Sequence, residues 1–387
     1  MEERIKLTRP LVVLTTAMII TGIIAFVSGF IKDPDRTWAN YLLNNFYFLS
    51  LSIGAMFFLS LQYISQSGWS AGFKRIPEAM GAYLPVAAVF FLVLVLGAGS
   101  LYHWAEPGAA EHDALIAHKA PYLNIPFWVI RIVVFFGLWI LLSRLLRKYS
   151  LREDREGGMD AFHRSEYYSR IFIFIIAFTF SMGVIDWIMS IDVHWYSTIF
   201  ALKNFVSAFY HGVVVLSFFV LILNQRGHFS FLNGSHLHDF TRYIFMLCII
   251  WGYFWFAEFM IIWYGNIPEE TAYFIPRFKD GEWSWIFYAN ILINWFLPFT
   301  ILMPRATSRS KTVLKLIIPL LILGMYIDLY QQIFVGTLGK PVFGFIELGS
   351  FIGYAGLFLL VTVYALSKAN LYPKNHPYLE ESLHHHF

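Results

Sequence analysis

Six ionisable residues stand inside long apolar stretches of the chain, where charged side chains are rare. They are Arg131, Asp186, Lys203, Glu258, Asp328 and Glu347. A charge at the centre of a membrane helix costs about 2.5 to 3.5 kcal/mol even on the mildest insertion scale, so such groups face protein or water and mark proton or ion paths. Two cations pair with only two of the four carboxylates. Because an unpaired buried carboxylate takes up a proton, the residues predict a protonatable chamber.

The alternative interpretation of these residues is structural. Interhelical salt bridges also place opposite charges at depth, where they fix the register of neighbouring helices. For any one residue the two interpretations are balanced, whereas the excess of acid over the whole set favours proton chemistry.

Membrane helices must position these groups. Apolar residues make up 58% of the 387 residues and charged residues 14%, a balance that excludes a soluble domain. Runs of about 20 apolar residues are long enough to cross a bilayer, where a helix satisfies its own backbone hydrogen bonds. The sequence therefore predicts an all-α integral membrane protein with ten transmembrane helices. The predicted spans are residues 11–31, 43–66, 81–101, 124–146, 170–191, 198–223, 241–264, 283–303, 312–333 and 343–366.

The predicted organisation is a single polytopic membrane domain over residues 1–387. Helices 1 to 4 occupy residues 1–150, a charged cytoplasmic loop follows at 150–170, and helices 5 to 10 occupy 170–387. The first apolar run has no cleavage pattern after it, so we expect a retained helix and not a signal peptide. An even number of spans puts both termini on one side. Most Lys and Arg residues fall in loops on that side, which predicts cytoplasmic termini.

The depth of the six groups follows from the helical rise. Asp186, Glu258 and Asp328 each come roughly 16 residues after their spans leave the cytoplasm, which is about 24 Å along a helix. The other three groups come about 4 to 7 residues after their spans start from the outer side, at a similar level. We therefore expect all six in one layer in the outer part of the bilayer.

One helical face extends this layer toward the middle of the membrane. Lys203, Tyr210 and His211 follow a spacing that puts them on one stripe. His211 is predicted to link the chamber toward the cytoplasm. Asp192 and His194 fall at the outer boundary of their span, and we expect them at the mouth of the chamber.

Metal and haem sites are not predicted in this chain. Cys248 is the only cysteine, which excludes a disulfide, a Cys-ligated iron-sulfur cluster and a CxxCH haem site within the chain. His211 is the only histidine inside a span, so a haem with two axial histidines is not expected. Two groups of His and carboxylate residues, at 111–118 and 235–239, lack a complete ligand set. No basic face for nucleic acid is visible.

Five stretches of the chain resemble the ActF subunits of bacterial alternative complex III, in the NrfD/PsrC-like family of integral membrane subunits. They are DWIMSIDVHWYSTIFALKNF at 186–205, IIWYGNIPEE at 261–270, YLNIPFWVIR at 122–131, GWSAGFKRIPEAMGAYLPV at 68–86 and HPYLEES at 376–382. The resemblance covers nearly the whole chain. It implies two four-helix bundles with two flanking helices, and a subunit of a respiratory quinol:electron acceptor oxidoreductase in the bacterial inner membrane.

The resemblance also implies cofactors and partners. Haem c and iron-sulfur clusters would lie in partner subunits, the related ActC membrane subunit would be a neighbour, and such complexes often stand next to a terminal oxidase. Menaquinol or another quinone would be the substrate of the complex. Within this chain we expect no bound cofactor other than a quinone.

The leading hypothesis is a subunit without redox centres that contributes a buried protonatable chamber or proton half-channel and anchors its redox partners. A second hypothesis gives the chain its own quinone headgroup site near Trp251 and Trp255. A third makes it a purely structural scaffold. A secondary transporter is the least favoured alternative. Transporters place their binding site near the membrane midplane between paired broken helices, and the sequence shows no such pair.

Overall fold

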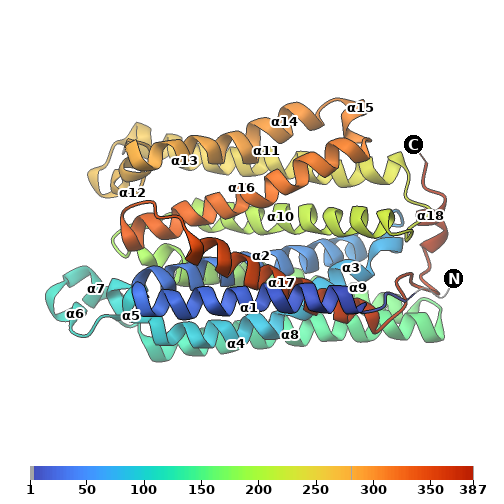
Figure 1. Cartoon of the computed structure of the whole chain (residues 1–387), viewed down its shortest axis with the longest axis horizontal. Helices are drawn as coiled ribbons and strands as arrows, with labels where there is room; N and C mark the ends of the chain where they lie inside the picture. The colour runs from blue at the N-terminus through green and yellow to red at the C-terminus, as the bar shows by residue number, and fades with distance from the viewer. Residues whose placement is uncertain (1–3, 280, 387) are drawn as a thin grey trace.

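The computed structural model describes residues 4–279 and 281–386. These residues form helices and no β-strand. Ten segments are long and apolar enough to cross a membrane, which confirms the predicted all-α fold of a multi-pass membrane protein. The long helices run side by side, and both chain termini lie at the same end of the bundle (Figure 1).

The helices, in chain order, are α1 Arg9–Lys32, α2 Pro34–Ile64, α3 Arg75–Met80, α4 Leu84–Leu94, α5 Ala98–Leu101, α6 Ala109–His112, α7 Ala114–Lys119, α8 Ile125–Glu156, α9 Asp160–Trp187, α10 Thr198–Gln225, α11 Gly234–Gly265, α12 Pro268–Phe278, α13 Gly281–Ile291, α14 Leu297–Leu302, α15 Arg305–Ser308, α16 Lys311–Leu338, α17 Phe345–Ser367 and α18 Leu379–Leu383. Short 3₁₀ turns connect α3, α4 and α5 into one span, and a π-helical turn at Leu292–Phe296 joins α13 to α14. We call the end with both termini the termini end, and the opposite end, with α6, α7 and α12, the loop end (Figure 1).

Several helices continue well beyond their apolar segments. α2 begins at Pro34, nine residues before the predicted span, and α8 runs on to Glu156. Since α9 begins at Asp160, only residues 157–159 separate two helices, and most of the predicted charged loop at 150–170 is helical. The Arg, Glu and Lys residues there are good helix formers, and Gly157 ends α8 with a positive φ of 67°.

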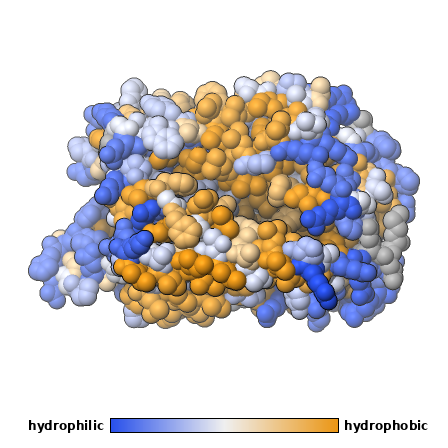
Figure 2. Space-filling model, viewed as in Figure 1, coloured by the Kyte–Doolittle hydropathy of each residue, from blue (hydrophilic) through white to orange (hydrophobic). Residues whose placement is uncertain are grey.

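The centre of the bundle is formed by α2 and α10. The apolar window of α2 is 94% buried and that of α10 is 83% buried, whereas the corresponding window of α1 is 22% buried. Helices around them expose Val, Ile, Leu and Phe side chains outward. Figure 2 shows the result on one face as an apolar band between hydrophilic ends, the pattern expected of a lipid-facing surface.

The spans contact one another in two rings. α2, α4, α8 and α9 form one ring, and α10, α11, the α13–α14 span and α16 form the other, while α1 packs on α17. α2 also packs directly on α10 and α16 of the other ring. The two rings therefore share a continuous interface, and the grouping into two four-helix bundles with two flanking helices stays a prediction.

Two glycines allow α2 and α10 to cross at the centre. A Cβ atom at Gly54 would lie 1.9 Å from the carbonyl oxygen of Ala208, and one at Gly212 would lie 2.6 Å from the carbonyl carbon of Gly54. Backbones approach this closely only where side chains are absent. The crossing sets the distance between the helices that carry the polar groups described below.

Replacing Gly54 with alanine is expected to separate α2 from α10 and to lower the free energy of unfolding by about 3 kcal/mol, as overpacking does in tightly packed cores. The measurement is thermal or denaturant unfolding in detergent micelles. Gly137→Ala is the matched control, because a Cβ atom there meets nothing within 4 Å. Equal stability of the two variants would contradict the close crossing.

Candidate functional site

The structure distributes the six predicted ionisable groups over three clusters between different helices. The first joins α8 to α9, the second joins α2 to α17, and the third lies among α10, α11, α13 and α16. All six groups are at most 5% exposed. The burial of all six groups was correctly predicted, and their contacts decide which groups remain available for proton chemistry.

The first cluster is a closed ion pair. Arg131 Nε and Nη2 donate to the two carboxylate oxygens of Asp186 at 2.5 and 3.2 Å, and Nη1 donates to the carbonyl oxygen of Tyr122 at 3.0 Å. The guanidinium also stacks on the rings of Tyr122 and Phe127, at 4.0 and 4.5 Å. Both carboxylate oxygens thus have charged donors in a bidentate arrangement. This cluster connects two helices and offers no unpaired carboxylate oxygen.

In the second cluster, Glu347 is neutralised by Arg36, a cation that was predicted to lie outside the spans. Arg36 Nε and Nη2 donate to Glu347 at 2.7 and 2.6 Å, and Asn40 adds a hydrogen bond of 2.9 Å. The predicted second span begins at residue 43, which leaves Arg36 in an outer loop. Because α2 begins at Pro34, Arg36 instead lies on the helix that faces α17.

The segment after α11 supplies a further buried cation, Arg277. Arg277 on α12 is 3% exposed, and its Nη2 lies 3.3 Å from the carboxylate of Asp192. Its guanidinium lies 3.4 Å from the ring centroid of Tyr273. Arg36 pairs with one of the four predicted carboxylates, whereas Arg277 pairs with a fifth, so the four predicted acids have three cations among them and not two. The excess of acid is smaller than the apolar spans suggested.

The two residues predicted at the mouth lie in different contacts. Asp192 is half-buried beneath Arg277, as described above. His194 is exposed and lies 3.0 Å from Asp113, which caps α7 on the neighbouring loop segment. Hydrogen bonds from the backbone N–H groups of Ile116 and Leu115 lower the pKa of Asp113, and His194 adds to this shift. Both residues lie at the loop end. Only Asp192 pairs with a cation, Arg277, that also lines the small polar cavity of the third cluster.

The third cluster surrounds a small polar cavity, which we call the chamber. Its volume is about 20 Å³, enough for one water molecule. Lys203, Glu258 and Asp328 line it together with Arg277 and Gln332. Lys203 Nζ lies 3.2 Å from Asp328 Oδ1. The chamber therefore brings together three of the six predicted groups and one cation that was not predicted there.

Two carboxylates in the chamber are incompletely paired. Glu258 accepts a hydrogen bond of 2.6 Å from Ser197 Oγ, and among the described residues no cation lies within ion-pair distance of it. Asp328 Oδ2 is buried and has no hydrogen-bond partner within residues 4–279 and 281–386. The side-chain amide of Gln332 is similarly unpartnered there. Buried polar atoms beside a water-sized cavity are typical of hydrated sites.

The chamber does not fit a quinone ring. Pockets that hold small molecules have volumes of about 300 to 1,000 Å³, far above the 20 Å³ found here. Trp251 is fully buried, and Trp255 stacks on Phe259 with ring centroids 5.7 Å apart. The cavity that Trp255 lines is therefore smaller than a quinone ring, and a quinone site near these two residues stays a prediction.

A chain of amides leads from the chamber to His211. Asn290 Nδ2 donates to Asp328 Oδ1 at 2.9 Å, and Asn294 Nδ2 donates to Asn290 Oδ1 at 2.6 Å. Asn294 Oδ1 then lies 3.3 Å from His211 Nε2. Asn294 belongs to the π-helical turn, a feature that often occurs at functional positions.

Tyr210, which was predicted for the same path, contacts this chain at its backbone. Its hydroxyl donates to the carbonyl oxygen of Asn294 at 3.3 Å. The other ring nitrogen of His211, Nδ1, lies 2.8 Å from the carbonyl oxygen of Ser207. The four-residue spacing of Asn290 and Asn294 is visible in the sequence, whereas their contact with His211 depends on how α13, α14 and α10 pack.

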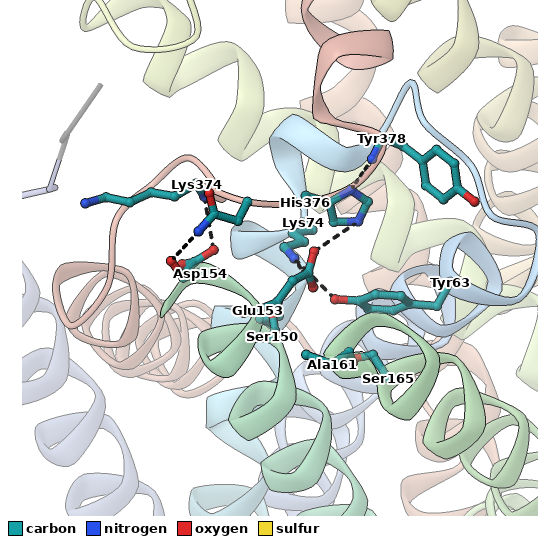
Figure 3. A network of polar contacts seen from close by, with 12 residues as sticks. Tyr63, Lys74, Ser150, Glu153, Asp154, Ala161, Ser165, Lys374, His376 and Tyr378 are labelled. Carbon is teal, nitrogen blue, oxygen red and sulfur yellow. Dashed lines mark hydrogen bonds and ion pairs between the residues drawn. The ribbon is translucent and has the colours of Figure 1, made fainter. Parts of the chain in front are cut away.

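A second buried network lies at the termini end (Figure 3). Glu153 is fully buried, with Lys74 Nζ 3.0 Å from Oε2 and His376 Nε2 3.9 Å from Oε1. Lys74 also donates to the hydroxyl of Tyr63 at 3.4 Å. Burial lowers the pKa of His376 to about 2, and the charges of Lys74 and Arg75 add to the effect. The imidazole is therefore neutral at pH 7, and its contact with Glu153 is not an ion pair.

Glu78 forms the other half of this termini-end network. It accepts from Arg75 at 2.7 Å, from Arg147 at 2.5 Å and from Ser150. Arg75 also pairs with Asp154. Buried carboxylates therefore occur at the termini end of the bundle as well as around the chamber. The sequence missed these groups because their helices extend past the apolar windows on which the predicted spans were based.

The C-terminal segment closes the termini end. His385 Nε2 lies 2.5 Å from Asp239 on α11, and Ser382 Oγ donates to the carbonyl oxygen of Trp69 at 2.8 Å. His236 Nε2 contacts the carbonyl oxygen of Ser382 at 2.9 Å. Figure 1 shows this segment passing over the ends of several helices. The contacts hold His376 against Glu153, so the segment is part of the network.

Comparisons of the chain with protein-family models and with curated proteins found no match. Within the described residues, no group of three His, Cys, Asp or Glu side chains is arranged to hold a metal ion.

Proposed function

We propose that this chain is a proton-transferring membrane subunit of a respiratory oxidoreductase. The observation that carries the proposal is the chamber, where Glu258 lacks a cation and Asp328 has one unpartnered oxygen beside a water-sized cavity. Groups in such surroundings exchange protons with water more readily than closed ion pairs do. Lys203 holds the chamber together electrostatically by its contact with Asp328.

The surrounding complex is proposed from the sequence resemblance. It is a quinol:electron acceptor oxidoreductase of the alternative complex III type in a bacterial inner membrane, with both termini of this chain in the cytoplasm. Haem c and iron-sulfur clusters belong to partner subunits, and an ActC-type subunit and a terminal oxidase are neighbours. In this arrangement the chain supplies a protonatable half-channel open toward the loop end and carries no electrons itself.

A structural scaffold is the second candidate function. The closed ion pairs of Arg131 with Asp186 and of Arg36 with Glu347 favour it, because each joins two helices and leaves no unpaired carboxylate oxygen. The two functions are compatible, since the ion pairs lie in clusters separate from the chamber.

Glu258→Gln tests the proposal in the intact complex. We expect proton release coupled to quinol oxidation to fall about tenfold. This is less than the roughly 100-fold typical of a sole proton-transferring group, because Asp328 remains in the same cavity. The measurement uses complex reconstituted in vesicles with a pH-sensitive dye. Glu269→Gln is the matched control, since Glu269 is exposed on the neighbouring α12. Unchanged proton release in an assembled Glu258→Gln complex would contradict the proposal, and the structural scaffold would be the remaining candidate function.

A further inference from the structure

A groove lies between α4, α8 and α17, in the half of the bundle toward the termini end. Its volume is about 400 Å³, within the range of pockets that hold small molecules. The groove combines two kinds of lining. Pro85, Val361 and Tyr364 are apolar or aromatic, whereas Arg144, Arg147 and Lys368 are cationic.

The groove carries a net positive charge. Among residues 4–279 and 281–386, Glu78 is the only carboxylate that lines it, and Glu78 is already neutralised by Arg75, Arg147 and the hydroxyl of Ser150. Arg144 and Lys368 are exposed, and among the described residues neither forms an ion pair with a carboxylate. Two cations therefore face the surroundings without a counter-ion.

The depth of the groove matches the boundary between hydrocarbon and lipid headgroups. Arg144 comes 19 residues after the start of α8, about 29 Å along the helix at 1.5 Å per residue. The hydrocarbon core is about 30 Å thick. Before Arg144, α8 exposes Val133 and Leu141, each more than half exposed, as a lipid-facing surface would.

The α17 side of the groove has the same interfacial character. Tyr364 is 51% exposed, and Lys368 Nζ lies 4.5 Å from its ring centroid. Tyrosine is enriched at membrane interfaces, and lysine there extends its ammonium group toward the headgroups. Arg147 connects the two walls, because its Nη2 donates to the carbonyl oxygen of Ala365 at 3.2 Å.

We propose that this groove binds an anionic phospholipid. Arg144 and Lys368 would contact the phosphate, and the acyl chains would lie along the apolar surface toward Pro85 and Val361. Basic pockets between helices at this level of the membrane are suited to anionic headgroups. A phosphate ion matches only the cations, whereas a phospholipid also covers the apolar lining. The bound lipid would join α8 to α17 independently of any proton transfer in the chamber.

The test compares lipid binding to the full chain in detergent by native mass spectrometry, with thermal unfolding as a second measurement. The probes are dioleoyl phosphatidylglycerol, dioleoyl phosphatidylcholine and inorganic phosphate. In Arg144→Gln/Lys368→Gln we expect the affinity for phosphatidylglycerol to fall about 30-fold, which corresponds to about 2 kcal/mol at 1.4 kcal/mol per tenfold change. Attraction of about 1 kcal/mol per basic residue supports that size.

Arg226→Gln/Lys315→Gln is the matched control, since both residues are exposed cations at the termini end outside the groove. We expect its affinity for phosphatidylglycerol to stay within twofold of wild type. Lys368→Gln alone, with an expected loss of about fivefold, serves if the double variant unfolds. Equal loss in the control, or equal binding of phosphatidylcholine, would overturn the proposal in favour of general lipid contact. Equal stabilisation against thermal unfolding by inorganic phosphate and by phosphatidylglycerol would show that the groove binds small anions and not a phospholipid.

Discussion

Replacing Asp186 with asparagine is expected to lower the free energy of unfolding by about 4 kcal/mol, because one partner of a buried ion pair is left uncompensated. Arg131 is 5% exposed, and Asp186 supplies both of its charged acceptors. Its remaining contacts are the carbonyl oxygen and ring of Tyr122 and the ring of Phe127, which carry no full negative charge. The measurement is denaturant unfolding of the full chain in detergent.

The double variant Arg131→Met/Asp186→Leu separates a structural role from a proton-transfer role. Replacing a complete buried ion pair with apolar side chains of similar size is often neutral or stabilising, so we expect stability within about 1 kcal/mol of wild type. Proton release by the assembled complex should also be retained, because neither residue lines the chamber. A well-folded double variant that has lost proton release would place this pair on the proton path.

The sequence predicted the elements that hydrophobicity determines. Ten apolar runs became ten spans, and the six ionisable groups are buried as the cost of lipid exposure requires. The helix ends were not predicted, because charged residues outside the hydrocarbon region extend a helix without changing the apolar pattern. Arg36, Arg75 and Glu153 all lie in such extensions, and each takes part in a buried ion pair.

Which ionisable groups pair with one another also could not be predicted from one sequence. Arg36 and Glu347 are 311 residues apart, and Lys203 and Asp328 are 125 apart. Depth along a helix follows from residue counting, whereas the direction that each group faces depends on which helices are neighbours. The six groups therefore lie in three clusters, and the one with Lys203, Glu258 and Asp328 surrounds a cavity.

The hydrogen bonds between Asp328 and His211 have a defined direction. Asn290 donates to Asp328 and Asn294 donates to Asn290, so Asn294 presents its oxygen to His211 Nε2. His211 Nδ1 faces another acceptor, the carbonyl oxygen of Ser207. A neutral imidazole donates from only one nitrogen, whereas an imidazolium donates from both. In this direction Asp328 accepts the hydrogen bond of Asn290, and an acceptor faces each ring nitrogen of His211.

The amides do not exchange protons themselves. An asparagine side chain is only a fixed donor and acceptor, so its effect on proton transfer comes from its orientation. The opposite direction of the chain matches a neutral His211 and a protonated Asp328, because Asp328 would then donate to Asn290. In the proposed function, the two directions couple proton occupancy at Asp328 and His211 through Asn290 and Asn294, and removing either amide is expected to break this coupling.

Asn294→Leu is expected to lower proton release coupled to quinol oxidation about tenfold in the reconstituted complex, less than the roughly 100-fold typical of losing a proton-transferring group, because Asn294 only orients its neighbours. Leucine has a similar volume but neither donates to Asn290 nor accepts from His211. Ser217→Ala is the matched control, because Ser217 is buried on the same helix as His211 and its hydroxyl donates only to Val213 at 2.8 Å. We expect that variant to stay within twofold of wild type.

The outcome of this substitution decides how far proton transfer extends into the bundle. Unpaired Asn290 and Gly324 oxygens would also cost about 1 to 3 kcal/mol each, so stability must be measured in the same samples. Asn294→Asp distinguishes the two effects, since it keeps an oxygen toward His211 but cannot donate to Asn290 when ionised. Unchanged proton release in a folded Asn294→Leu complex would confine the chemistry to Lys203, Glu258 and Asp328. His211 would then be a packing residue whose hydrogen bonds only fix the π-helical turn.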